Sequence, residues 1–124
     1  MSKYKYFTEE EFLRCKPSSS LYGMSERLLR MLDEARELAG IPFRITSAIR
    51  SYDYEIFHGR SGKSSHCIGK AVDIACSDSH SRLLIVWALL AVGFRRIGIY
   101  SRHIHVDNDD LKNDCLFLGS YEKE

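Results

Sequence analysis

The sequence has no long hydrophobic run and no excess of charge of either sign. Its longest apolar stretch, LLIVWALLAV at residues 83–92, is far shorter than the run of about 18 residues that a membrane-spanning helix needs. We therefore expect a buried helix there and no membrane partner. The 18 basic and 17 acidic residues nearly balance, which gives no electrostatic reason to expect nucleic acid as a partner.

Cysteine is also scarce. The four cysteines, Cys15, Cys67, Cys76 and Cys115, show no C-x-x-C spacing and are too few to suggest a disulfide framework. We expect four reduced thiols, and a zinc site that uses Cys67 or Cys76 is the alternative.

The N-terminus, MSKYKYFTEEEF, lacks the apolar core of a secretory signal. We expect the chain as written to stay in the cytoplasm that makes it, and to reach an external target only after release or delivery. A length of 124 residues with 44% hydrophobic residues fits one domain with a modest core. We therefore expect a single domain over residues 1–124, monomeric, in which 108–124 form a C-terminal extension.

The first half of the chain predicts helices followed by a strand. Thr8 is a candidate N-cap for a short acidic helix, and Ser25 is a candidate N-cap for a longer one. The apolar positions of the longer helix follow helical spacing, and Gly40 and Pro42 end it; these positions are Leu28, Met31, Leu32, Ala35 and Leu38. Residues 43–50 predict a strand, and 51–65 predict a long loop.

The second half predicts strands around one more helix. KAVDIAC at 70–76 is a short strand, and Ser79 or Ser81 can cap a helix over 82–92. RRIGIY and HIHVDN are two strands joined by a tight turn near Ser101 and Arg102. This order indicates an α+β fold with a small, mostly antiparallel sheet packed with helices.

Ionisable residues share one face of the last strand. Because side chains alternate between faces, His103, His105 and Asp107 lie on one face, while Ile104 and Val106 lie on the other. In the strand before it, Asp73 shares its face only with small residues, Ala71 and Ala75. Both strands therefore present an apolar face to a core and a face suited to a site.

Histidine and aspartate are ligands that zinc prefers, and a catalytic zinc keeps one position free for water. His66, Asp73 and His105 can supply three such ligands. Taken singly, each has a simpler explanation, as a residue of a solvated strand face or of a loop. Together the two segments predict a metal site.

The motif around His66 resembles a known family. SSHCIGKAVDI at 64–74 matches the pattern S-x-H-x-x-G-x-A-x-D of the zinc D-Ala-D-Ala carboxypeptidase family of murein peptidases, whose fold hedgehog signalling domains and several phage endolysins share. ITSAIRS at 45–51 resembles the family's strand-to-loop segment that ends in a functional arginine. GFRRIGIYSRHIHVD at 93–107 resembles its closing hairpin, which carries the last zinc ligand.

The resemblance implies a role for each matching residue. His66, Asp73 and His105 are then the zinc ligands, with Gly69 allowing the turn between the first two. Arg50 binds a substrate carboxylate or polarises the carbonyl under attack. A surface arginine at a strand end is its simpler explanation.

The general base is open between His103, which we favour, Asp107 and a further residue that the motifs do not identify. Some members of the family place a catalytic histidine two residues before the last ligand, at the position of His103, and others place a glutamate three residues before it, where this chain has Arg102. An arginine cannot act as that base. Ser64 and Ser65 are candidate substrate contacts with an equally good explanation as loop residues, and we assign no role to His58, His80, Tyr52 or Tyr54.

The resemblance predicts a zinc-dependent peptidase that cleaves peptidoglycan stem peptides, at the D-Ala-D-Ala bond or at an internal bond. Phage lysis enzymes and tail-associated proteins include compact members of this kind. The alternative is a zinc-stabilised binding module without turnover, and a metal-free structural protein is a third possibility.

Overall fold

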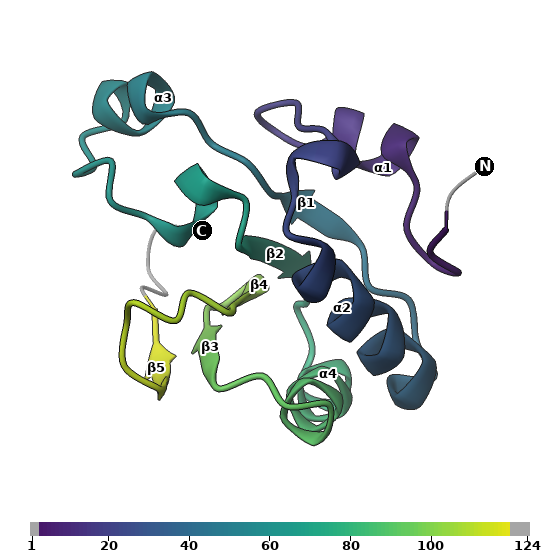
Figure 1. Cartoon of the computed structure of the whole chain (residues 1–124). Coiled ribbons are helices and arrows are strands. Elements are labelled where there is room, and N and C mark those ends of the chain that lie inside the picture. Colours follow the sequence, from purple (N-terminus) through teal and green to yellow (C-terminus); the bar gives the residue numbers. More distant parts are fainter. Residues whose placement is uncertain (1–2, 120–124) are drawn as a thin grey trace.

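The computed structural model describes residues 3–119 and confirms the predicted α+β class. Its helices are α1 (Glu9–Leu13), α2 (Glu26–Ala39), α3 (Tyr52–Phe57) and α4 (Ser79–Ala91), with short 3-10 helices η1 (Leu21–Gly23) and η2 (Ser65–Ile68). The strands are β1 (Ile45–Ser47), β2 (Ala71–Ala75), β3 (Arg96–Ile99), β4 (His103–Asp107) and β5 (Cys115–Leu118). They form one sheet in the order β1-β2-β4-β3-β5, with helices packed around it (Figure 1).

The predicted start and end of the long helix are confirmed. Ser25 caps α2 by accepting a hydrogen bond from the backbone N–H of Leu28. Gly40 follows the helix with φ of 74°, a left-handed conformation that glycine adopts at little cost. Thr8 caps α1 in the same way.

The start of α4 differs from the prediction. Asp78, and neither Ser79 nor Ser81, is the N-cap, because its carboxylate accepts a 2.9 Å hydrogen bond from the backbone N–H of Ser81. The negative charge also suits the positive end of the helix dipole. The helix therefore begins at Ser79, ahead of the predicted residue 82.

The predicted long loop at 51–65 was wrong in its first half. Ser51 caps α3 by accepting a 3.1 Å hydrogen bond from the backbone N–H of Tyr54, and Asp53 and Glu55 lie in the first turn. A capping serine followed by acidic residues is a sequence signal for a helix start. The aromatic residues of the segment masked that signal.

The sheet is mixed because its last strand is parallel to its neighbour. The pairs β1–β2, β2–β4 and β3–β4 are antiparallel, whereas β5 pairs with β3 in parallel. The expected C-terminal extension thus contributes an edge strand to the main sheet (Figure 1). Residues 120–124 of that extension lie outside the described part.

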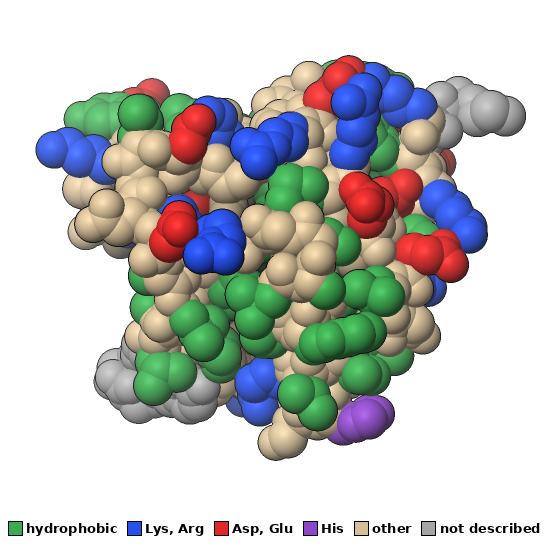
Figure 2. All heavy atoms as spheres, turned by 60° about the horizontal axis from the view of Figure 1, so that its bottom comes forward, with side chains coloured by type: hydrophobic (Ala, Val, Ile, Leu, Met, Phe, Trp, Pro, Cys, Tyr) green, Lys and Arg blue, Asp and Glu red, His purple; other side chains and the backbone are tan. Residues whose placement is uncertain are grey.

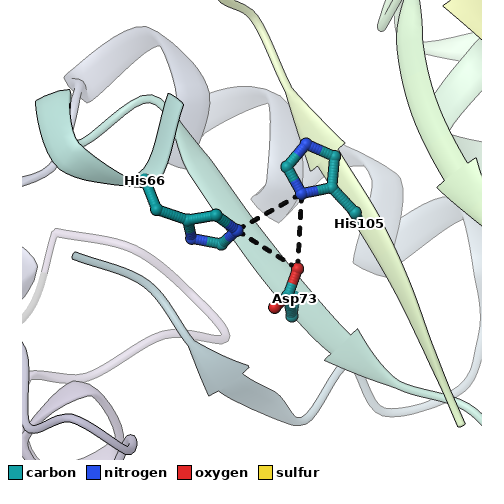
Figure 3. A group of neighbouring side chains, drawn as sticks. All are labelled: His66, Asp73 and His105. Carbon is teal, nitrogen blue, oxygen red and sulfur yellow. Dashed lines mark hydrogen bonds and ion pairs between the residues drawn. The ribbon is translucent and has the colours of Figure 1, made fainter. Parts of the chain in front are cut away.

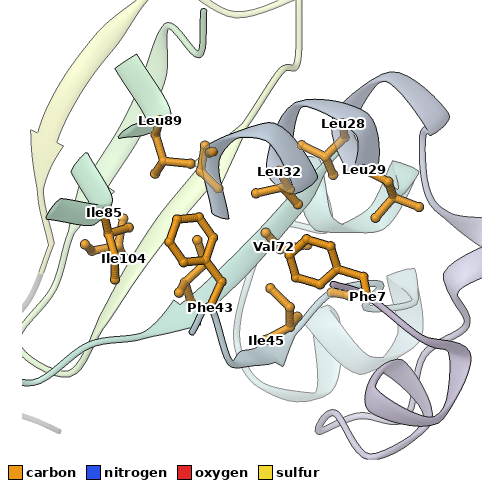
Figure 4. Packing of buried hydrophobic residues seen from close by; sticks show 14 of the residues in the cluster. Phe7, Leu28, Leu29, Leu32, Phe43, Ile45, Val72, Ile85, Leu89 and Ile104 are labelled. Carbon is orange, nitrogen blue, oxygen red and sulfur yellow. The ribbon is translucent and has the colours of Figure 1, made fainter. Parts of the chain in front are cut away.

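Helices α2 and α4 pack together against one face of the sheet. Leu28 and Leu32 of α2 meet Ile85 and Leu89 of α4 in one buried cluster (Figure 4). The same cluster contains the strand residues predicted to point inward, namely Val72, Ile74, Ile104 and Val106. Removing these side chains from water stabilises the sheet that carries the site.

All four cysteines are free thiols. Among the helices of residues 3–119, none has the length and apolar character needed to cross a bilayer.

Candidate metal centre

One row of residues crosses all five strands of the sheet. Asp73 is the register partner of Ser47 on β1 and of His105 on β4. His105 is in turn the partner of Gly98 on β3, and Gly98 is the partner of Phe117 on β5. Register partners in a sheet present their side chains to the same face. The face opposite the hydrophobic core thus carries two of the three predicted ligands side by side.

The third ligand, His66, comes from η2. Ser64 caps this short helix, and Gly69 ends it with φ of 71°. A side chain at position 69 would also place its Cβ 2.5 Å from the carbonyl oxygen of Gly23. Glycine is therefore required for the turn that brings His66 back over β2, as the sequence predicted.

The three predicted ligands converge on one point (Figure 3). Nε2 of His66 lies 3.3 Å from Nδ1 of His105 and 3.3 Å from Oδ1 of Asp73. Nδ1 of His105 lies 3.4 Å from the same oxygen. Zinc bonds of about 2.0–2.1 Å in a tetrahedron separate the donor atoms by about 3.3 Å. These donors therefore have the spacing of three corners of a zinc site.

The carboxylate of Asp73 fits this interpretation. Oδ1, which faces the histidines, is buried and has no hydrogen-bond partner among the described residues, while Oδ2 accepts a 2.8 Å hydrogen bond from Nη2 of Arg50. Burial alone raises the pKa of Asp73, but the contacts with His105 and His66 outweigh burial, so the pKa lies well below its ordinary value. The group is charged, and one oxygen is directed at the metal position.

Each histidine has its outer nitrogen held by the protein. Nδ1–H of His66 donates to the carbonyl oxygen of Ala48 at 2.7 Å, and Nε2–H of His105 donates to Oδ2 of Asp107 at 2.6 Å. These contacts leave the inner nitrogens as lone-pair donors, which is the usual arrangement around metal-binding histidines.

Asp107 lies behind His105 instead of facing the cleft. It is fully buried, and its Oδ1 accepts hydrogen bonds from Nε of Arg96 at 2.7 Å and from the backbone N–H of Asp109 at 3.1 Å. Both carboxylate oxygens already accept hydrogen bonds, one of them from His105. The role of Asp107 is therefore to orient the imidazole ring of His105. The prediction that it is an alternative general base is not supported.

Arg50 lies beside the metal position, at the β1 end of the row. Its Nε donates to Oγ of Ser47 at 2.9 Å, and its Nη1 lies 3.5 Å from Oε2 of Glu55. Glu55 is fully buried and also pairs with Arg60 at 2.9 Å. Glu55 was not predicted from the sequence, because a carboxylate in a predicted loop is normally solvated.

His103 shares the face of the ligands and lines the same cleft. Its Nε2 lies 3.9 Å from Oδ2 of Asp73, and its ring stacks on Tyr100 at 4.2 Å between centroids. Arg102, in contrast, is exposed. The predicted preference for His103 is therefore compatible with the structure.

The two serines have different surroundings. Ser64 lines the cleft, although its hydroxyl also caps η2. Ser65 is buried, donates to Asp109 at 2.8 Å and accepts from Nζ of Lys112 at 3.1 Å. Those contacts give Ser65 a structural role and do not support its prediction as a substrate contact.

The metal position opens into a cleft of about 830 Å³. His66, Asp73, His103, His105 and Arg50 all line it. Tyr54 also lines the cleft, whereas His58, His80 and Tyr52 are exposed and lie outside its lining. Neither Cys67 nor Cys76 belongs to the ligand group, so the cysteine alternative is not supported.

Comparison with known families gives a match over most of the chain. The model of a family described as Peptidase M15 matches residues 5–107, a range that includes every site residue predicted from the sequence. A search of curated proteins found no match.

We expect the purified protein to bind about one zinc ion per chain. Replacing His66, Asp73 or His105 with alanine should reduce the bound metal to near zero, because each supplies one of the three donors that meet here among residues 3–119. Elemental analysis after removal of free metal measures this stoichiometry. His80→Ala is the control and should keep full loading; equal loading in all four variants would exclude the site.

Asp107→Asn should weaken zinc binding about 10- to 100-fold, because the amide cannot satisfy both His105 and Arg96 as an acceptor. Competition with a chelator of known affinity measures the change. Asp110→Asn removes an exposed carboxylate near the same strand and should leave the affinity unchanged. A wild-type affinity in the Asp107 variant would show that this contact does not orient His105.

We expect the stabilisation of the folded protein by bound zinc to increase with pH. Burial alone lowers the pKa of His105, but the contacts with Asp107 and Asp73 outweigh burial and raise it. In the metal-free protein this stabilising charge is present at low pH and is lost as pH rises through the raised pKa. Metal binding requires the neutral imidazole and strengthens over the same range. The difference in Tm between loaded and chelated protein should therefore widen from about pH 5.5 to 8, and a constant or narrowing difference would contradict this assignment.

Proposed function

The chain belongs to the peptidase M15 family, a family of zinc-dependent metallopeptidases, and on that premise we propose that it cleaves peptidoglycan stem peptides. The target bond is the terminal D-Ala-D-Ala bond or an internal bond of the stem or cross-link. The wall lies outside the cell membrane, so we also propose release or delivery in the manner of a phage lysis or tail-associated enzyme.

One observation carries the proposal. The donors of His66, Asp73 and His105 are spaced for zinc, and they lie in an open cleft beside a histidine and an arginine that are not in the ligand group. A purely structural zinc site is normally closed by four protein ligands. Three donors facing a cleft are typical of a catalytic site that leaves a position for water.

Zinc bound by these residues supplies a Lewis acid that polarises a carbonyl and lowers the pKa of a water molecule to about 7. The proton of the attacking water must then reach the leaving amine. We propose His103 for this transfer, because it shares the face of His105 and lines the cleft. In this proposal its imidazole accepts the proton and returns it to the amine.

We propose that Arg50 holds the substrate. Ser47, Asp73 and Glu55 fix its guanidinium at one side of the metal position. A planar guanidinium recognises a carboxylate or a polarised carbonyl through paired N–H groups. In this proposal Arg50 binds such a group of the peptide and aligns the scissile bond.

The charge of the cleft supports an acidic peptide as substrate. Besides Arg50, the described residues that line it include four cationic ones, Lys16, Arg60, Lys63 and Lys112, but only two carboxylates, Glu55 and Asp73. Both carboxylates are already paired with arginine or directed at the metal position. A peptide that ends in D-Ala-D-Ala presents a carboxylate next to the scissile bond, which this positive lining attracts.

The second candidate is a zinc-stabilised binding module without turnover. It is favoured by Arg102, which stands where some members of the family carry a glutamate. Digestion of defined muropeptides, with mass analysis of the products, separates the two functions. Release of D-Ala or of a shorter peptide, abolished by a chelator and restored by zinc, supports the peptidase; full zinc loading without any product supports the binding module.

We expect His103→Ala to keep its fold and its zinc but to lose about a hundredfold or more in kcat, the scale of general acid–base catalysis. Steady-state hydrolysis of the peptide identified above measures the loss, and metal analysis confirms the loading. His80→Ala is the matched control and should retain wild-type kcat. A His103 variant with the full rate would place the base on another residue.

A further inference from the structure

Phe117 lies in the cleft although it comes from outside the part of the chain that matches the family. The match ends at residue 107, whereas Phe117 belongs to β5 (Cys115–Leu118). Its place in the sheet is the outer end of the row that contains Asp73 and His105, with only Gly98 between it and His105. The C-terminal segment thus contributes a side chain to the face that holds the metal ligands.

Gly98 explains how the ring reaches the site. A Cβ at this position would lie 2.3 Å from the Phe117 ring, which is closer than any real contact allows. Adjacent strands lie about 4.8 Å apart, so a side chain two strands away from β4 would normally stand beside the site. Because Gly98 has no side chain, the Phe117 ring lies over it. The centroid of this ring is 5.8 Å from the centroid of the His105 ring.

The ring also belongs to an aromatic wall that extends to His103. Phe117 meets Tyr100 edge-on at 6.3 Å, and Tyr100 stacks on His103 at 4.2 Å with an interplanar angle of 15°. A second glycine leaves room for this arrangement, since a Cβ at Gly119 would lie 2.1 Å from the Tyr100 ring. Packing of this kind gives the wall a defined position.

Phe117 differs chemically from the rest of the cleft. Among the described residues that line it, Phe117 alone has a side chain without a polar atom. Its ring is only partly buried, so apolar surface remains exposed to the cleft. Exposed apolar surface within an otherwise polar and cationic cleft is suited to one part of a ligand, because an apolar group gains by leaving water there.

We propose that Phe117 is a specificity-determining residue, whose ring packs against the apolar side chain of a substrate residue next to the scissile bond. The ring centroid of Phe117 lies 5.8 Å from that of His105, whereas one residue of an extended peptide spans at most about 3.6 Å. The substrate residue that contacts Phe117 must therefore be a close neighbour of the bond held at the metal position. Charged groups of the peptide then face the cationic lining. This inference rests on the proposed peptidase function and adds β5 to the substrate site.

The test is a comparison of peptides with D-alanine or glycine on either side of the cleaved bond. Wild-type protein should prefer the methyl-bearing peptide at one of these positions by about tenfold in kcat/KM, the scale of a single group in an apolar pocket. Phe117→Ala should abolish that preference while zinc loading stays complete. Phe117→Leu, which keeps an apolar side chain, should retain most of it.

Gly98→Ala is a second test of the Phe117 contact, because the new Cβ displaces the Phe117 ring without removing it. It should also reduce the preference, and it should have no further effect in the Phe117→Ala background. Leu118→Ala is the matched control, since this neighbouring residue is 77% exposed and lies outside the lining of the cleft. It should keep the wild-type preference.

The proposal is overturned if Phe117→Ala keeps the wild-type preference, or if Leu118→Ala loses it to the same extent. A wild-type protein that cleaves none of the peptides contradicts the proposed peptidase function. In that case calorimetry of the same peptides binding to zinc-loaded protein still tests the contact between Phe117 and the peptide side chain. Wild type should bind the D-alanine peptide more tightly than its glycine counterpart, and loss of that difference in Phe117→Ala supports the inference, whereas an unchanged difference overturns it.

Discussion

The buried carboxylate of Asp73 is the group on which the site depends. It lies on a central strand with only 6% of the residue exposed, and a charge in such a place is costly unless other groups compensate it. Arg50 compensates one oxygen, and the two histidines surround the other. Further polar contacts hold these partners: Ser47 and Glu55 hold Arg50, Ala48 holds His66, and Asp107 holds His105.

The sheet brings the groups that compensate Asp73 together on one face. Register pairing brings one residue from each strand into a row, so residues far apart in the sequence meet on one face without a long loop. The opposite face of the same strands packs against α2 and α4, and this packing supports the row from behind. A rigid support is what a metal site and an aligned general base require. The edge strand β5 extends the row past His105 and places the ring of Phe117 in the lining of the cleft.

Some elements were predictable because their signals are local. The alternation of apolar and polar residues in HIHVD and KAVDIAC correctly predicts that Ile104, Val106, Val72 and Ile74 face the core. The short helix α3 was missed, because its cap at Ser51 stands among aromatic residues that resemble a loop. The edge strand β5 was missed as well, since a short apolar segment gives no indication of which strand it joins.

The sequence by itself determined the candidate ligand set, the core-facing sides of the strands and the general α+β order. Each of these depends on residue type and on spacing along a few neighbouring residues. Only the tertiary structure decided what surrounds the ligands. Asp107 is behind His105, Glu55 is buried between two arginines, and Phe117 lies over Gly98, all because separate segments meet in space. Contacts between distant segments depend on strand register and on the space that a glycine leaves. A local residue pattern predicts neither of them.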